Sequence, residues 1–128
     1  IILIIISNII LFNIASIVEN VTEQDIYSNE TREKEVSDAR RIYGQIARQT
    51  THYSYREIGE HIGKNHATIM HYCKTSESLI KYDKDFERIY LECLDRVMDV
   101  SQQSILENSY LYHKKKMLYY QNKLEEAI

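Results

Sequence analysis

Apolar side chains recur every three or four residues along most of the chain, which is the spacing of one face of an α-helix. A helix is predicted over 36–49, and these positions form its apolar face: Val36, Ala39, Tyr43, Ile46 and Ala47. A second helix is predicted over 9–20, with an apolar face formed by Ile10, Ile14, Ile17 and Val18. Alternating runs separated by glycine turns do not occur, so β-hairpins are poorly supported. The pattern predicts an all-α fold.

Two shorter helix signals follow each other closely. Ser54 and Glu57 fit the S-x-x-E capping box, which predicts that a helix begins just after Ser54. Gly63 is suited to the left-handed backbone conformation that ends many helices. Asn65 is a good N-cap for a further helix over 66–80. Together these signals predict a helix-turn-helix.

The helix predicted over 66–80 has two unlike faces at 100° per residue. Apolar and small side chains gather on one face: Ile69, Tyr72, Cys73, Ser76 and Ile80. The opposite face carries small, polar and basic side chains: Ala67, His71, Lys74 and Ser78. The apolar face can anchor the helix while the other looks outward, as a DNA-recognition helix requires.

The chain is short enough for one domain with a helical tail. Residues 1–97 are expected to form the domain, with 1–8 as an apolar extension. Another helix is predicted after Asp83, with a break near 101–104. Residues 98–128 are predicted to form a helical C-terminal extension.

The apolar N-terminus has the composition, but not the flanking charges, of a membrane segment. Fourteen of the residues in 1–18 are apolar, but polar side chains interrupt them and no basic residues flank them. A spanning helix needs about 20 mainly apolar residues, and orientation signals are basic. We therefore expect a buried helix here, with a membrane anchor as the alternative.

The net charge is −3, but the charged residues are distributed unevenly along the chain. Residues 1–39 hold two basic and seven acidic side chains. Residues 40–81 hold seven basic and three acidic side chains, and residues 82–128 hold seven basic and nine acidic ones. The basic segment coincides with the predicted helix-turn-helix, and a local basic surface can bind phosphate. Cys73 and Cys93 are too few for a disulfide framework, which indicates a reducing cytoplasm.

Metal, nucleotide and catalytic motifs are poorly supported. His61, His66 and His71 are five residues apart, about 140° around a helix, whereas zinc motifs such as HExxH place both ligands on one face. The spacing from Gly59 to Gly63 is one residue too short for a phosphate loop. No pairing of the kind used by a catalytic nucleophile and its base stands out. The sequence therefore predicts no enzyme activity, metal or cofactor.

DNA recognition is the interpretation that uses the most features. The first residues of the second helix in a helix-turn-helix meet base edges in the major groove. Here they are Asn65, His66, Ala67 and Thr68. Asparagine can pair with adenine through two hydrogen bonds, and methyl groups can pack on thymine. Each residue has an ordinary structural explanation, such as helix capping, but together on a basic helix pair they favour base reading.

Three stretches resemble the C-terminal DNA-binding domain of the bacterial replication initiator DnaA: "VSDARRIYGQIARQTT", "SYREIGEHIGK" and "NHATIMHYCK". The resemblance covers roughly 9–97 and implies a Trp-repressor-like helix-turn-helix bundle. It implies base contacts from 65–68 and an arginine, Arg32, in the minor groove. Contacts to the DNA backbone or minor groove are expected from this set: Arg32, Arg40, Arg41, Arg48, Arg56, Lys64, His71 and Lys74.

This sequence also departs from the family pattern. The signature aspartate is Asn65 here, which exchanges a carboxylate for an amide that both donates and accepts. One glycine of the usual pair before Lys64 is missing. Full-length initiators carry an ATPase module before this domain and end soon after it, whereas residues 98–128 follow here. The C-terminal segment favours a stand-alone DNA-binding protein of phage or mobile-element origin over a simple truncation.

The function expected from the sequence is sequence-specific binding of double-stranded DNA at a DnaA-box-like or operator-like site. The protein would act in replication initiation or its control, without ATPase activity, in the cytoplasm of a bacterial cell or a phage-infected host. Double-stranded DNA is the expected partner, with replication proteins as further partners and no nucleotide. The alternative is a helical interaction adaptor attached to a membrane through residues 1–18.

Overall fold

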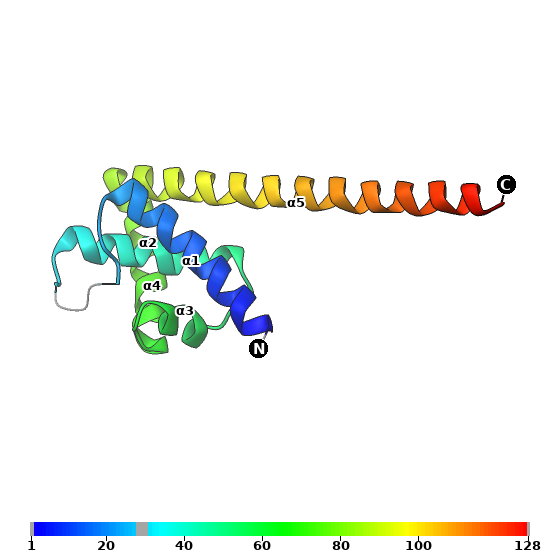
Figure 1. The fold of residues 1–128 in the computed structure, drawn as a ribbon. Coiled ribbons are helices and arrows are strands. Elements are labelled where there is room, and N and C mark those ends of the chain that lie inside the picture. The colour runs from blue at the N-terminus through cyan, green and yellow to red at the C-terminus, as the bar shows by residue number, and fades with distance from the viewer. Residues whose placement is uncertain (1, 28–30, 128) are drawn as a thin grey trace. The chain divides into compact units, whose positions relative to one another are not determined.

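Five helices account for most of the residues that the computed structural model describes (Figure 1). The model describes the backbone of 2–27 and 31–127, and the side chains of 9–27, 31–100, 114 and 117–126. The helices are α1 (Ile2–Thr22), α2 (Lys34–Thr50), α3 (Tyr55–His61), α4 (His66–Tyr82) and α5 (Lys84–Ala127). Within the described backbone there is no strand. The predicted all-α helix-turn-helix class is confirmed.

Contacts divide the chain into two units, Ile1–Val97 and Met98–Ile128. The first unit holds α1 to α4 and the first turns of α5. The second consists of the remaining turns of α5, and its described side chains are exposed. The break predicted near 101–104 is wrong, because α5 is continuous through these residues.

The first helix is longer than predicted, and its inner face is rotated. Ile10 was expected on this face but is 37% exposed, and Leu11 is buried in its place. The buried set has the three-and-four spacing of a helix face: Leu11, Ile14, Ala15 and Val18. A helix that is apolar almost all round carries a weak periodic signal, which explains the error. The side chains of the predicted extension 1–8 lie outside the described residues.

A membrane span is not found among the helices that the model describes. Four apolar residues of α1 lie in the core of the first unit, where α1 packs against α2 (Figure 1): Leu11, Ile14, Ala15 and Val18.

The second helix is the centre of the first unit. It contacts α1, α3 and α4, and every residue of its predicted apolar face is buried. The hydroxyl of Tyr43 donates a 2.9 Å hydrogen bond to the carbonyl oxygen of Ile58 on α3. Since a buried hydroxyl without a partner would cost free energy, this bond fixes where α3 crosses α2.

The turn between α3 and α4 has the geometry that its residues predict. Ser54 and Glu57 form the complete capping box at the start of α3. Gly63 has a φ of 72°, which glycine adopts without steric cost. A Cβ on Gly59 would lie 2.4 Å from the carbonyl oxygen of Lys64, so glycine is required where α3 meets the turn. These contacts set the angle at which α4 leaves α3.

The first turns of α5 complete the core. Phe86, Tyr90, Cys93 and Val97 are buried, and the Tyr90 hydroxyl donates to Oε1 of Gln49 on α2. Both cysteines are unbridged and buried. Burial raises the pKa of the Cys73 thiol to about 11 and that of Cys93 to about 12. Because the thiolate is the reactive form, these thiols act as small apolar side chains.

Candidate nucleic-acid interface

The first turn of α4 is exposed and tightly organised. Asn65 caps the helix, and its Oδ1 accepts hydrogen bonds from the backbone N of Thr68 at 2.8 Å and from Thr68 Oγ1 at 3.0 Å. His66 and Ala67 follow on the exposed side, and Thr68 is half-buried. All four residues predicted to meet base edges therefore lie together at one end of one helix.

The inner face of α4 is locked onto α2. Ile69, Cys73 and Ser76 are buried, as the helical angles predicted. Ser76 Oγ donates to the carbonyl oxygen of Arg41 at 3.1 Å, and the thiol of Cys73 lies 3.6 Å from the carbonyl oxygen of Gly44. Apolar packing and two polar contacts thus hold the recognition face in a fixed orientation.

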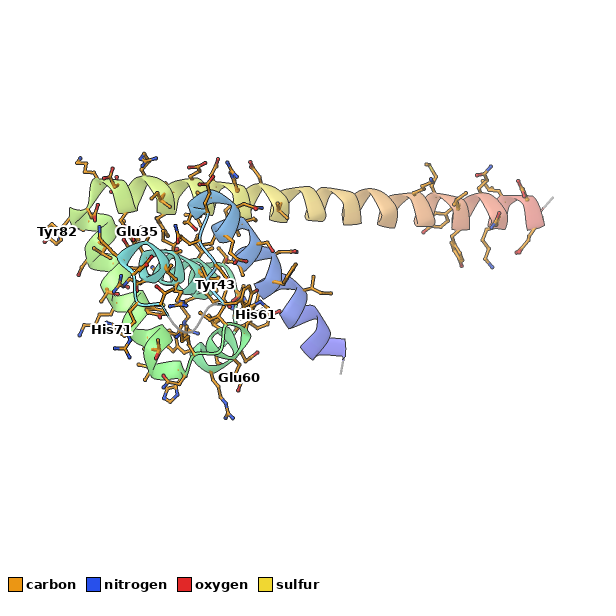
Figure 2. The ribbon with its side chains drawn as sticks, turned by 60° about the vertical axis from the view of Figure 1, so that its left-hand side comes forward. Glu35, Tyr43, Glu60, His61, His71 and Tyr82 are labelled. Carbon is orange, nitrogen blue, oxygen red and sulfur yellow. The ribbon has the colours of Figure 1, made fainter. Side chains whose placement is uncertain are left out.

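The outer face of α4 carries the side chains that a groove would meet. Ala67, His71 and Lys74 are exposed, and Figure 2 shows His71 on the side of α4 that points away from α2. Met70 is 50% exposed and lies at one edge of this face, about 40° from Lys74 and about 60° from Ala67 in helical angle. Met70 was not among the residues predicted to contact DNA, and its position at the margin of the outer face explains the omission.

Two predicted arginines lie near the start of α3. Arg48 donates from Nη1 to the carbonyl oxygen of Tyr53 at 3.0 Å, and its guanidinium lies 4.2 Å from the centroid of the Tyr55 ring. This stacking orients an exposed cation. Arg56 is also exposed and pairs with Glu60 at 3.1 Å. A phosphate could compete for Arg48 more easily, because no carboxylate holds it among the ion pairs described.

Arg40 occupies a different place from the one expected. It was predicted to face phosphate, but it is only 3% exposed. Its Nε donates to the carbonyl oxygen of Ile26 at 3.1 Å, and its Nη1 donates to that of Thr31 at 3.1 Å. The spacing of apolar residues along α2 cannot reveal that Arg40 is buried, because its hydrogen-bond partners come from the loop that precedes the helix. In this conformation Arg40 holds the loop and does not reach the surface.

The neighbouring Arg41 is half-buried and also engaged. Its Nη1 lies 2.8 Å from Oδ1 of Asp38 on the preceding turn of α2. Arg41 therefore lies near the surface of α2 with part of its charge already paired.

Arg32 and Lys64 lie near Arg40. Arg32 is exposed just ahead of α2, and Lys64 is half-buried in the turn before α4. The pKa of Lys64 is lowered, first by burial and then by the positive charges of Arg40 and Arg32. Three cations from the loop, α2 and the turn therefore contribute positive potential beside the first turn of α4.

A cluster of aromatic side chains joins the same loop to α3. The hydroxyl of Tyr27 is 2.7 Å from Nε2 of His61. The ring of His61 also lies beside that of Tyr43, with centroids 6.3 Å apart (Figure 2). The loop that carries Arg32 is thus attached to both α2 and α3.

The histidines considered as metal ligands lie in different environments. His61 is half-buried on α3, while His66 and His71 are exposed on α4. Among the described side chains no group of three or more histidine, cysteine or acidic residues is arranged to hold a metal ion.

Comparison with known proteins identifies one family. Residues 11–75 match the model described as the bacterial dnaA protein helix-turn-helix. The chain is 38% identical over 66 residues to the chromosomal replication initiator protein DnaA of Bacteroides thetaiotaomicron, covering 51% of the chain and 14% of the relative.

Two further relatives carry the same description. The protein of Trichormus variabilis is 32% identical over 79 residues, covering 61% of the chain and 17% of the relative. That of Aliarcobacter butzleri is 31% identical over 90 residues, covering 70% and 20%. The chain therefore spans a fifth or less of the length of these relatives.

Proposed function

The chain belongs to the bacterial DnaA helix-turn-helix family, and from this we propose that it binds double-stranded DNA sequence-specifically through the start of α4. The observation that carries the proposal is the exposed first turn of α4 beside an inner face fixed on α2. We assign base contacts to Asn65, His66, Ala67 and Thr68. Met70 extends this surface by one turn and offers an apolar contact for a thymine methyl group.

Phosphate contacts flank this surface. On one side Arg32 and Lys64 contribute positive charge from the loop and the turn. Elsewhere Arg48, Arg56, His71 and Lys74 are exposed on α2, α3 and α4. Arg41 contributes positive charge near the surface that would face phosphate. Arg40 acts indirectly, by holding the loop that carries Arg32. Such contacts supply most non-specific affinity and orient the protein on the duplex.

A role in replication initiation or its control follows from the description that the relatives share. The part of the relatives that this chain matches is small, so the proposal concerns DNA recognition by these 128 residues. We propose that this recognition needs no nucleotide, because the sequence contains no motif that would cradle a triphosphate.

Selection of bound sequences from a random duplex library tests the proposal. Purified residues 1–128 would be used at physiological salt, with and without ATP, and folding checked by circular dichroism. Enrichment of a single motif, unchanged by ATP, supports the proposal. The absence of any enriched motif from a folded protein overturns it.

A further inference from the structure

Asn65 is held in one orientation by its role as a helix cap. The atom that lies 2.8 Å from the backbone N of Thr68 must be the oxygen Oδ1, because a backbone N–H can only donate. The same oxygen accepts a second hydrogen bond from Thr68 Oγ1 at 3.0 Å. An amide oxygen has two lone pairs, so both acceptor sites of Asn65 are occupied.

This orientation leaves Asn65 with a donor and no acceptor for DNA. Nδ2 makes no hydrogen bond within the described part of the chain, and Asn65 is exposed at the end of α4. The two-bond pairing with adenine expected from the sequence needs Oδ1 to accept from adenine N6. That pairing would require the cap to break.

We propose that Asn65 reads a keto base, guanine through O6 or thymine through O4, at one base pair of the site. The inference rests on the proposed DNA-binding function. Guanine and thymine each present an acceptor oxygen in the major groove, whereas cytosine and adenine present an amino group there, in adenine beside the acceptor N7. An outward amide N–H₂ matches the keto oxygens and opposes the amino groups, so the preference should be strongest against cytosine and weaker against adenine.

The substitution Asn65→Asp reverses this chemistry while keeping the cap. Aspartate caps helices as well as asparagine, and one carboxylate oxygen can accept both bonds from Thr68. The second oxygen then takes the place of Nδ2 and can only accept. It favours cytosine N4 or adenine N6, so the base preference should move from keto to amino at one position.

The experiment compares the wild-type chain, Asn65→Asp and Asn65→Ser in the same random-duplex selection. Serine keeps the cap but removes the outward amide, so it should lose the preference at this position only. The added charge of aspartate near phosphate weakens all binding, so the readout is base preference and not affinity. Competition between duplexes that differ at this one base pair gives its size, which we expect to be about 2- to 12-fold, the usual range for one hydrogen bond.

The outcomes separate this inference from the proposed function. A keto preference in the wild type that becomes an amino preference in Asn65→Asp and disappears in Asn65→Ser supports the inference. If a wild-type motif is enriched but both variants retain every preference, Asn65 does not read a base, and DNA binding still stands. If the folded wild type enriches nothing, the proposed function falls and this inference falls with it.

Discussion

The hydroxyl of Tyr27 lies 2.7 Å from Nε2 of His61, and this contact joins the loop ahead of α2 to the end of α3. The two rings meet edge to face, with centroids 5.5 Å apart. Burial lowers the pKa of His61 below its usual range, since the charged imidazolium loses hydration there. The neutral ring is therefore the form that the fold favours.

Stability should fall as the pH is lowered through the range below the ordinary histidine pKa. There the unfolded chain binds a proton at His61 that the folded chain resists, so acid favours unfolding. Urea unfolding of the wild type and His61→Gln at pH 7.5 and 5.5 measures this. Glutamine can still accept from Tyr27 but does not titrate, so the variant should lose less stability on acidification. An equal loss in both proteins would exclude His61 as the cause.

Gly59→Ala should destabilise the protein by about 1–3 kcal/mol through overpacking. The added Cβ would lie 2.4 Å from the carbonyl oxygen of Lys64, so the turn before α4 must move. Gly44→Ala is the matched control, because its nearest neighbour is a carbon of Tyr72 at 3.6 Å, an ordinary contact. Chemical denaturation of both variants gives the comparison. Equal effects would contradict the close approach at Gly59.

Arg40→Met should cost about 1.5–3 kcal/mol, the usual value for losing hydrogen bonds to a charged group. The carbonyl oxygens of Ile26 and Thr31 would lose their donor, and the loop that carries Arg32 would lose its anchor. DNA affinity should therefore fall together with stability. Arg41→Met, on the neighbouring position, removes a partly exposed pair with Asp38 and should cost less than about 1 kcal/mol. Chemical denaturation and DNA titration of both variants test this prediction. Equal losses of stability and of affinity in the two variants would contradict the role of Arg40 as the loop anchor.

Arg48→Ala should weaken binding to all duplexes by a similar factor, because its cation is expected to meet phosphate. The slope of log K against log salt should be roughly −4 to −5 if about five phosphates are neutralised, and this variant should make it about one unit less steep. Arg88→Ala on α5, a loosely paired exposed arginine, is the control that should change little. A wild-type slope near zero would instead favour the adaptor hypothesis.

Thr68→Ala should lower specific binding by about 1–3 kcal/mol with little effect on non-specific DNA. The variant loses the methyl group and the hydroxyl that donates to Asn65, but its backbone N–H can still be capped. Titration of the selected site and of a scrambled duplex tests this prediction. If the variant weakens both equally, Thr68 contributes through general affinity and not through base reading.

Local signals were the most reliable guide to this fold. The capping box at Ser54, the positive φ at Gly63 and the cap at Asn65 depend on neighbours within a few residues, so the sequence could predict them. The apolar face of α2 was equally clear because polar positions frame it. The assignment of Ile10 failed because α1 is apolar on nearly every side.

The features that the sequence could not reveal depend on contacts between distant segments. Arg40 looks like a surface cation on α2, and only the loop that folds back over it makes it a buried donor. The orientation of the Asn65 amide, by contrast, is a local feature, fixed by its two hydrogen bonds to Thr68, and was missed because the residue was considered as a cap or a base contact separately. The roles assigned to individual residues in DNA binding remain predictions.

The loop ahead of α2 is held by Arg40 through main-chain oxygen atoms, which every amino acid supplies. An anchor of this kind does not depend on which side chains the loop carries. Substitutions of loop side chains should therefore leave these two hydrogen bonds in place, whereas an insertion or deletion between the two carbonyls would change their spacing. The loop sequence can vary in this way while its anchor to α2 is kept.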